Sequence, residues 1–274
     1  MLVRLAFLGL LLTLTSTPSA AFSAKTASDP NDLIGPVQTV TTKSSYFSYT
    51  EHYDRAGNLI ESVINDEHDK TSYRYAFTYS QKGMLQEENA YSGDGTLKYR
   101  KLFAYGYDAD GRKTAVVAAS QDGTFKHGEF LIHDSKGLLS ESLFYTGSMI
   151  YRSVFDALGH IIYSATFREG QLLYERKWAY DNKGGLIGLF VYSPTGIITG
   201  QTRYERDDSG KLVREITEQF ADGLKSKWAT TYEYDNMGNW IKKSMNQENG
   251  GPEGSSKMQS RVVEERVIVY YENR

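Results

Sequence analysis

One short pattern returns along most of the chain and constrains the fold more than any other feature. It consists of a tyrosine and an aspartate, two variable residues and a glycine, and its strict form begins at Tyr53, Tyr107, Tyr180 and Tyr234. Aligned by the glycine, similar units follow one another at intervals of 22 to 28 residues. The glycines are Gly57, Gly83, Gly111, Gly137, Gly159, Gly184, Gly210 and Gly238. Self-similarity at such a period indicates a repeat architecture.

Each unit has the chemistry of a tight turn between two strands. An aspartate side chain accepts hydrogen bonds from backbone amides further along, and glycine adopts a positive φ without steric cost. Such a turn joins antiparallel strands, with a bulge at the glycine. The turn aspartates are Asp54, Asp108, Asp134, Asp156, Asp181, Asp207 and Asp235. We expect the residue before the aspartate to face the apolar residue two positions after the glycine, as Tyr53 would face Leu59.

The segments between these turns alternate as strands do. Tyr73, Tyr75, Phe77 and Tyr79 are separated by single small or charged residues, and a period of two places each set of side chains on its own face of a sheet. Further turn signals, such as Gly93-Asp94-Gly95, lie between successive repeat turns, so each unit supplies two strands. The sequence predicts an all-β antiparallel meander of about sixteen strands, forming a curled sheet or an open or closed barrel-like shell.

The two ends of the chain differ from the repeats. The first residues combine one positive charge, an apolar run from Leu5 to Leu14 and small residues, which is the layout of a secretory signal peptide. That run is shorter than the ~20 residues that a membrane-spanning helix needs. Cleavage is expected after Ala21, with Ala20 or Ala24 as alternatives. The expected organisation is a signal peptide (1–21), a lead-in segment and strand (22–49), the hairpin repeats (50–245), and a polar loop with a capping strand (246–274).

The composition limits where the protein is expected to be located and which partners it is expected to bind. The chain contains no cysteine, which excludes disulfides, thiol catalysis, cysteine-held metals and a lipid anchor on cysteine. Its net charge is −3, and removal of Arg4 with the signal peptide gives −3 − 1 = −4. A mildly acidic chain is a poor nucleic-acid binder. We therefore expect a protein that is released into the periplasm or outside the cell and that does not bind nucleic acid.

The Tyr-Asp-x-x-Gly-x-Leu units resemble those of the YD-repeat family, also called RHS repeats. The resemblance covers about residues 50 to 245, and the Gly238-Asn239-Trp240 unit is similar to the last unit of short exported bacterial members. It implies long antiparallel strands, which in large members wind into a hollow shell around a toxin or other cargo. No toxin domain and no core signature of the large members follow the last repeat, so only the repeat architecture is expected to apply.

No set of residues has the pattern of an enzyme or of a cofactor site. The histidines lack metal-binding spacing, and His133 occupies the tyrosine position of its repeat, which favours a packing role. Nucleophile, phosphate and dinucleotide motifs are absent from the sequence. Asp108 and Asp110 fit a turn better than a calcium site, which needs six or more oxygen ligands. We expect a non-catalytic protein without a metal or cofactor.

Glutamates recur four residues after the repeat glycine, at Glu61, Glu87 and Glu141. Strict alternation would place them on the same face as the tyrosines and leucines. A glycosidase needs one special pair of carboxylates, whereas these residues recur along the chain. We interpret them as a rim-facing or ion-paired row.

The aromatic residues are the main candidates for ligand binding. Tyrosine and tryptophan on an exposed sheet could stack on sugar rings, but a wholly aromatic face is better explained as core, since each buried ring removes about 150–250 Å² from water. Trp240 is singled out because it lies at the end of the array, where coverage could be incomplete. The candidate ligand-binding residues are Trp240, Trp178, Tyr180, Tyr232 and Tyr234.

The sequence therefore predicts an exported scaffold or binding module at the cell envelope, with a glycan or another protein as its partner. The alternatives are an outer-membrane β-barrel, an enzyme that acts on polysaccharide, and a component of a toxin or adhesion system. An outer-membrane barrel needs a lipid-facing band without charge over about 25 Å. Lys101 and Arg176 are expected on the aromatic face and Arg74 and Glu175 on the other, so neither face meets that need.

Overall fold

The computed structural model describes residues 33–122, 126–221, 224–249 and 260–272. The predicted signal peptide and most of the predicted polar loop lie outside these ranges.

All regular secondary structure in the described residues is β. The strands of the first half are β1 (Val37–Ser44), β2 (Phe47–Tyr53), β3 (Leu59–Asp66), β4 (Thr71–Tyr79), β5 (Leu85–Ser92), β6 (Leu97–Tyr107), β7 (Lys113–Ser120), β8 (Lys126–His133) and β9 (Leu139–Thr146). Those of the second half are β10 (Met149–Phe155), β11 (Ile161–Arg168), β12 (Gln171–Tyr180), β13 (Leu186–Tyr192), β14 (Ile198–Arg206), β15 (Leu212–Ala221), β16 (Leu224–Tyr234), β17 (Trp240–Asn249) and β18 (Ser260–Tyr270).

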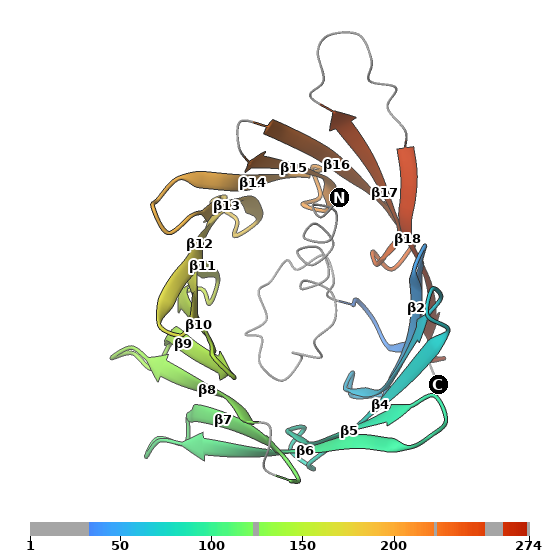
Figure 1. Ribbon diagram of the computed structural model, residues 1–274, viewed down its shortest axis with the longest axis vertical. Helices are drawn as coiled ribbons and strands as arrows, with labels where there is room; N and C mark the ends of the chain where they lie inside the picture. The colour runs from blue at the N-terminus through green and yellow to red at the C-terminus, as the bar shows by residue number, and fades with distance from the viewer. Residues whose placement is uncertain (1–32, 123–125, 222–223, 250–259, 273–274) are drawn as a thin grey trace, which may run out of the picture.

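The strands close into a barrel, seen end-on in Figure 1. Each strand pairs antiparallel with its neighbours in the chain, and β1 pairs with β18 as well as with β2, which makes one 18-stranded sheet without a free edge. The predicted all-β antiparallel meander is confirmed. The repeats supply β2–β17, while the lead-in strand β1 and the final strand β18 add the two that complete the circle. Strand β17 runs through Asn249, so residues 246–249 belong to a strand and not to the loop.

The repeat turns share one hydrogen-bonding arrangement. In the first of them, the Asp54 amide donates to the Asn58 carbonyl at 2.9 Å, and the Gly57 amide donates to the Asp54 carbonyl at 3.0 Å. The Asp54 carboxylate accepts from the Ala56 and Asn58 amides at 2.9 and 2.8 Å. The same pair of backbone bonds recurs at every repeat glycine, and all of these glycines have a positive φ. The aspartate therefore accepts backbone amides of the turn, and the glycine adopts the positive φ that the turn requires.

A bulge follows each of these turns and alters the faces of the strand that leaves it. Tyr53 pairs with Leu59, as the pattern predicts, but His52 pairs with Glu61, which leaves Ile60 as an extra residue. The same register shift recurs in the other repeats. Because of it, Glu61 lies on the face opposite Leu59, and the expectation that the glutamate row shares the tyrosine face is wrong. Bulges increase the local twist and bend of a sheet, which helps the strands to close.

Replacement of Gly111 by valine tests this turn geometry. Gly111 has a φ of +77°, and an added Cβ would meet no atom within 4 Å, so the expected cost arises from the backbone conformation alone. We expect the free energy of unfolding to fall by about 1–3 kcal/mol, measured by chemical denaturation. Asparagine tolerates this conformation better, so Gly111→Asn should cost less than Gly111→Val. An unchanged stability of Gly111→Val would contradict the turn assignment.

Candidate functional site: the inner wall of the barrel

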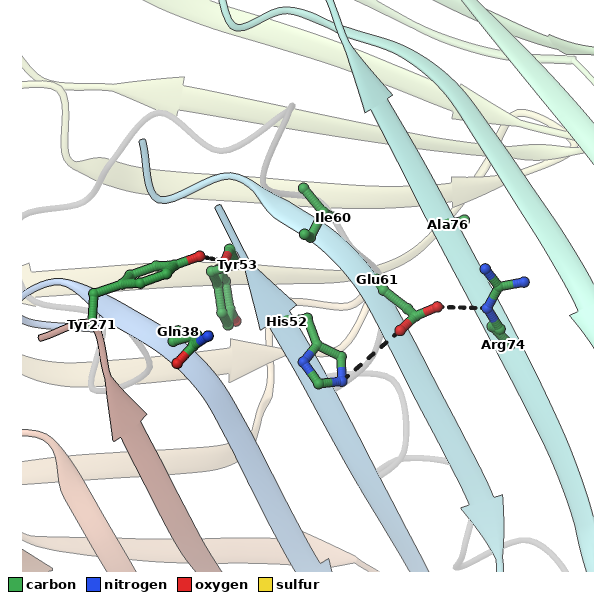
Figure 2. Close-up of a pocket in the computed structure, with 8 residues that line it drawn as sticks. All are labelled: Gln38, His52, Tyr53, Ile60, Glu61, Arg74, Ala76 and Tyr271. Carbon is green, nitrogen blue, oxygen red and sulfur yellow. Dashed lines mark hydrogen bonds and ion pairs between the residues drawn. The ribbon is translucent and has the colours of Figure 1, made fainter. Parts of the chain in front are cut away.

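The face that carries Tyr53 and Leu59 is the inner wall. Side chains converge on the concave side of a curved sheet and cover one another, and this face contains the buried Leu59, Phe77 and Leu85 with Tyr53 packed against them. The opposite face leaves large apolar side chains exposed, among them Ile60 at 40% and Phe130 at 50%. Figure 2 views this outer face, with the far wall of the barrel behind the strands that carry it.

Tyrosine hydroxyl groups on the inner wall bind several hairpins to the one before. Tyr79 donates to the Leu59 carbonyl at 2.8 Å, and Tyr180 and Tyr234 make the same bond to Ile161 and Leu212 at 2.9 and 2.5 Å. Burial raises the pKa of each of these three tyrosines to about 12. Phenylalanine would supply the ring without this hydrogen bond, which gives a physical reason for tyrosine at these three positions.

Charged groups lie among the rings of the inner wall. Glu88 is only 5% exposed and accepts from the Tyr99 hydroxyl and the Lys101 ammonium, both at 2.8 Å. The Lys101 ammonium lies 4.8 Å from the centre of the Tyr99 ring, a cation–π distance. Burial raises the pKa of the Glu129 carboxyl above its usual range. The inner wall therefore offers flat ring faces together with hydrogen-bonding groups held in place by their neighbours.

The barrel is too wide for its own side chains to fill. Strands about 4.8 Å apart, tilted by roughly 40°, give 18 strands a diameter of about 35 Å between opposite backbones. Barrels of 16–18 strands enclose a channel and not a packed core. Most of the inner aromatic rings are half-buried against neighbours on the same wall, so the side chains of the described strands leave room for a guest.

The predicted ligand-binding residues all lie on the inner wall, in two separate groups. Trp178 and Tyr180 belong to β12, while Tyr232, Tyr234 and Trp240 come together from β16 and β17. The Tyr232 ring lies 6.3 Å from Tyr234 and 6.4 Å from Trp240. On β12, the Tyr180 ring stacks on His160 at 4.5 Å. The structure thus places these residues on one wall but brings only the second group into contact.

Trp240 does not have the incomplete coverage expected from its place in the repeat array. It is 1% exposed, because β18 and β1 continue the sheet past it. The Arg266 guanidinium carbon lies 3.5 Å from the centre of its ring, and the Lys243 ammonium lies 4.2 Å away. Such a ring packs the closure of the barrel and is not presented to a ligand in this conformation.

Asn239 has a role that the sequence reasoning missed. Its side-chain oxygen accepts from the Ile34 amide at 2.6 Å, and its nitrogen donates to the Ile34 carbonyl at 2.8 Å and to the Tyr270 hydroxyl at 2.7 Å. The residue is 2% exposed. It ties the N-terminal lead-in and the final strand to the last repeat. The signal in the sequence is that, of the repeat units, only the last has Asn-Trp after its glycine.

The outer wall carries the glutamate row as ion pairs. Glu61 binds Arg74 at 2.5 Å, and Glu141 binds Arg152 at 2.8 Å. Glu87 binds Arg100 at 2.5 Å in the same way, so the predicted ion pairing of the row is confirmed on the other face. Figure 2 shows the first pair beside His52, whose imidazole lies 3.9 Å from Glu61, in a shallow depression of about 370 Å³.

The turn aspartates that suggested calcium have other contacts. Asp108 and Asp110 bind the Arg112 guanidinium at 2.6 and 2.8 Å. Within residues 33–272, leaving out the undescribed gaps, no three histidine, aspartate or glutamate side chains are grouped as a metal site requires. No long apolar helix of the kind that spans a bilayer occurs in that same part of the chain.

Comparison with known proteins gives distant structural likenesses. No family model matches the chain, and no curated protein matches it. A chain in a crystal structure of TcdB2-TccC3-Cdc42 is 13% identical, with 86% of this chain and 16% of that chain covered and a TM-score of 0.35. A porin-like protein from Bacteroides uniformis is 10% identical, with 86% and 99% covered and a TM-score of 0.44. One from Bacteroides vulgatus is 14% identical, with 86% and 98% covered and a TM-score of 0.23.

The chain spans about a sixth of the length of the first of these structures. Because these identities and TM-scores are low, the function is inferred from the side chains on the inner and outer walls of the barrel. A closed barrel with an even number of antiparallel strands is the architecture of bacterial outer-membrane barrels. In its architecture, the chain therefore fits the outer-membrane alternative better than the predicted scaffold or binding module.

Proposed function

We propose that this protein is an exported, non-catalytic barrel of the cell envelope that holds a glycan or a protein segment against its inner wall. The observation that carries the proposal is an inner wall of aromatic rings and fixed polar groups in a barrel too wide to fill itself, with ion pairs within the strands of the outer wall. A membrane barrel has an uncharged apolar band outside, whereas the Glu61–Arg74 and Glu141–Arg152 pairs interrupt the apolar side chains of this outer wall. Export rests on the signal peptide pattern of residues 1–21.

The chemistry of the inner wall supports such a partner. Ring faces of tyrosine and tryptophan pack against apolar side chains and against the flat faces of sugars, while their polar atoms form hydrogen bonds. Trp178 and Tyr174 project from the same strand, and the Arg176 guanidinium between them lies 4.9 Å from the Tyr174 ring. Repetition of similar groups around the wall suits a long partner that is bound at several points. We also propose that the repeats are of the YD type, because turn geometry and the tyrosine bonds recur from unit to unit.

Binding by the protein purified after export tests the proposal. A panel of glycans and a panel of peptides should each be tested, and we expect one of them to contain a binder. Trp178→Ala should weaken that binding at least tenfold, because it removes a ring from the inner wall. The matched control is Phe190→Ala, which removes a ring from the outer face of the neighbouring strand, and it should change binding by less than twofold. The absence of any binder, or an equal loss in both variants, would reject an inner-wall site.

An outer-membrane barrel is the second candidate, favoured by the closed antiparallel architecture. The outer ion pairs oppose it, since an exposed lysine or arginine at the bilayer midplane costs about 2–4 kcal/mol, and Glu61–Arg74 and Glu141–Arg152 both lie within strands on this face. Cell fractionation distinguishes the two candidates. We expect the protein in the soluble periplasmic or extracellular fraction. Recovery in the membrane pellet after a high-salt wash would favour the outer-membrane candidate.

A further inference from the structure

One part of the inner wall, formed by β9 to β14, has positive charges without negative ones. The register of these strands, which the structure describes in full, places three arginines and no aspartate or glutamate at inward positions. They are Arg168, Arg176 and Arg206. The inward carboxylates on either side are already bonded, Glu129 of β8 to Ser142 and Glu215 of β15 to Tyr232. The chain as a whole has a net charge of −3, so this positive region is a local feature.

Two of these arginines are engaged near the ends of their strands. The Arg206 guanidinium donates to the Leu186 and Gly210 carbonyls at 3.4 and 3.0 Å. Arg168 is exposed at the last position of β11, and its Nε lies 3.4 Å from the Met149 sulfur. Neither side chain lies in the middle of the wall.

Arg176 differs, because its charge lies in mid-strand and has no acceptor among the described residues. It pairs with Ser164 on β11 and with Val191 on β13, which are both uncharged. Its guanidinium carbon lies 4.9 Å from the centre of the Tyr174 ring, and this cation–π contact is its interaction with the described part of the chain. The side chain is half-buried. Its five N–H donors are therefore available to a partner in the interior.

A row of hydroxyl groups leads to this arginine. Ser142, Ser153 and Ser164 pair directly with one another across β9, β10 and β11, and Ser164 pairs with Arg176. We refer to these four residues as the polar row. At about 4.8 Å between strands, the row extends for roughly 14 Å, which is longer than one sugar ring. The Ser153 and Ser164 hydroxyls form no hydrogen bond with residues 33–272, the undescribed gaps left out.

Aromatic rings lie on both sides of the polar row. Inward neighbours in a strand are two residues apart, so Tyr151 and Phe155 flank the row on β10, while Tyr174 and Trp178 flank it on β12. The Tyr151 ring lies 5.8 Å from that of Phe144 on β9. The hydroxyls of Tyr151 and Tyr174 have no hydrogen bond within the described strands. The row therefore combines ring faces with hydrogen-bonding groups that the described protein leaves unused.

We infer that the polar row binds an acidic glycan, whose carboxylate is held by Arg176. The inference rests on the proposed function and names the class of its partner. A guanidinium binds a carboxylate through two parallel hydrogen bonds. Serine and tyrosine hydroxyls both donate and accept hydrogen bonds, as sugar hydroxyls do. The flanking rings supply flat apolar faces for the sugar rings.

The sheet and its charges favour a glycan over an acidic peptide. An extended peptide that binds to a sheet pairs its backbone with a free strand edge, and this closed sheet has none. A peptide with several carboxylates would also need several free cations, whereas the polar row contains one. A sugar chain that carries one carboxylate among many hydroxyls matches the single guanidinium and its neighbouring hydroxyls.

Isothermal titration of the exported protein with paired trisaccharides tests the inference. Each has a central glucuronic, galacturonic or mannuronic acid between neutral sugars, and its partner is the methyl ester, which keeps the rings and hydroxyls but not the charge. We expect the wild-type protein to bind at least one acid tenfold or more tighter than its ester. Arg176→Gln should weaken binding of that acid at least tenfold and of the ester less than twofold.

The matched control is Lys177→Gln. It removes the same charge from the exposed, outward position that follows Arg176 in β12, and it should change the affinity for the acid by less than twofold. A second variant, Ser164→Val, removes a hydroxyl from the polar row and should weaken acid and ester alike by threefold or more. The melting temperature of each variant checks that it folds, and either polar-row variant alone suffices for the test.

Four results would overturn the inference, and they bear differently on the proposed function. Equal binding of acids and esters would reject the carboxylate site but would still support a glycan on the inner wall. An equal loss in Lys177→Gln would indicate general electrostatic attraction. Binding of a hexapeptide of alternating glutamate and glycine, with none of the trisaccharides bound, would identify an acidic peptide as the partner. A protein that binds no glycan and no peptide would reject the inference and the proposed function together.

Discussion

Trp240→Ala is expected to lower the free energy of unfolding by about 3–5 kcal/mol. The ring is 1% exposed, so its removal leaves a cavity and exposes the stems of the residues packed on it. Arg266 loses the ring that its guanidinium covers at 3.5 Å, and Lys243 loses a cation–π contact at 4.2 Å. Far-UV circular dichroism during urea denaturation measures the effect without relying on tryptophan fluorescence.

The control for this prediction is Trp228→Ala. Trp228 lies on the same inner wall, on the neighbouring strand β16, and is half-buried, so its removal should cost about 1–2 kcal/mol by loss of buried area. Comparing the stability losses of the two variants distinguishes a specific role of Trp240 in closing the barrel from the general cost of removing a large ring. If both variants lose the same stability, Trp240 has no special part in the closure.

Asn239→Ala is expected to cost roughly 1–3 kcal/mol, because it removes a buried side chain and leaves the partly buried Ile34 amide and carbonyl without their partners. The effect should be local as well as global. Amide hydrogen exchange in β1 and β18 should become faster than in β8 and β9, which lie far from the closure. Mass spectrometry of peptides from the exchanged protein measures this difference.

Asn58→Ala is the matched control for Asn239. Asn58 occupies the same position of the first repeat, but its side chain binds only its own turn, through the Asp54 carboxylate at 2.8 Å. We expect a loss of about 1 kcal/mol or less, the net value of one partly exposed hydrogen bond. An equal cost for the two variants, or unchanged exchange in β1 after Asn239→Ala, would rule out a clamp at the closure.

The local structure follows closely from the sequence because it is encoded within a few residues. The aspartate and glycine of each unit form the turn with their own neighbours, and the pairing of Tyr53 with Leu59 follows from the number of residues in that turn. The alternation of aromatic and small residues gives the strands. Each of these features depends on contacts between residues that are close in the chain.

Other features required information that a local pattern does not hold. Closure depends on the pairing of β1 with β18, which arises from the summed twist and bend of all the strands between them. The bulge that moves Glu61 to the outer wall breaks the alternation from which its face was predicted. Trp240 is at the end of the repeat array, where the sequence predicts incomplete coverage, but β18 and β1 continue the sheet past it. Sequence alone therefore identified the aromatic wall but not which of its rings are covered.

The closing pair of strands also limits how such a barrel can change in length. Every repeat contributes an outgoing and a returning strand, so duplication or deletion of a whole unit keeps the first and last strands antiparallel and alters only the circumference. Gain or loss of a single strand would make these two strands run in the same direction, with a different hydrogen-bond pattern, and Asn239 could no longer meet the backbone of Ile34. Genes for related barrels should therefore differ in size by steps of one complete unit, between about 22 and 28 codons in this chain.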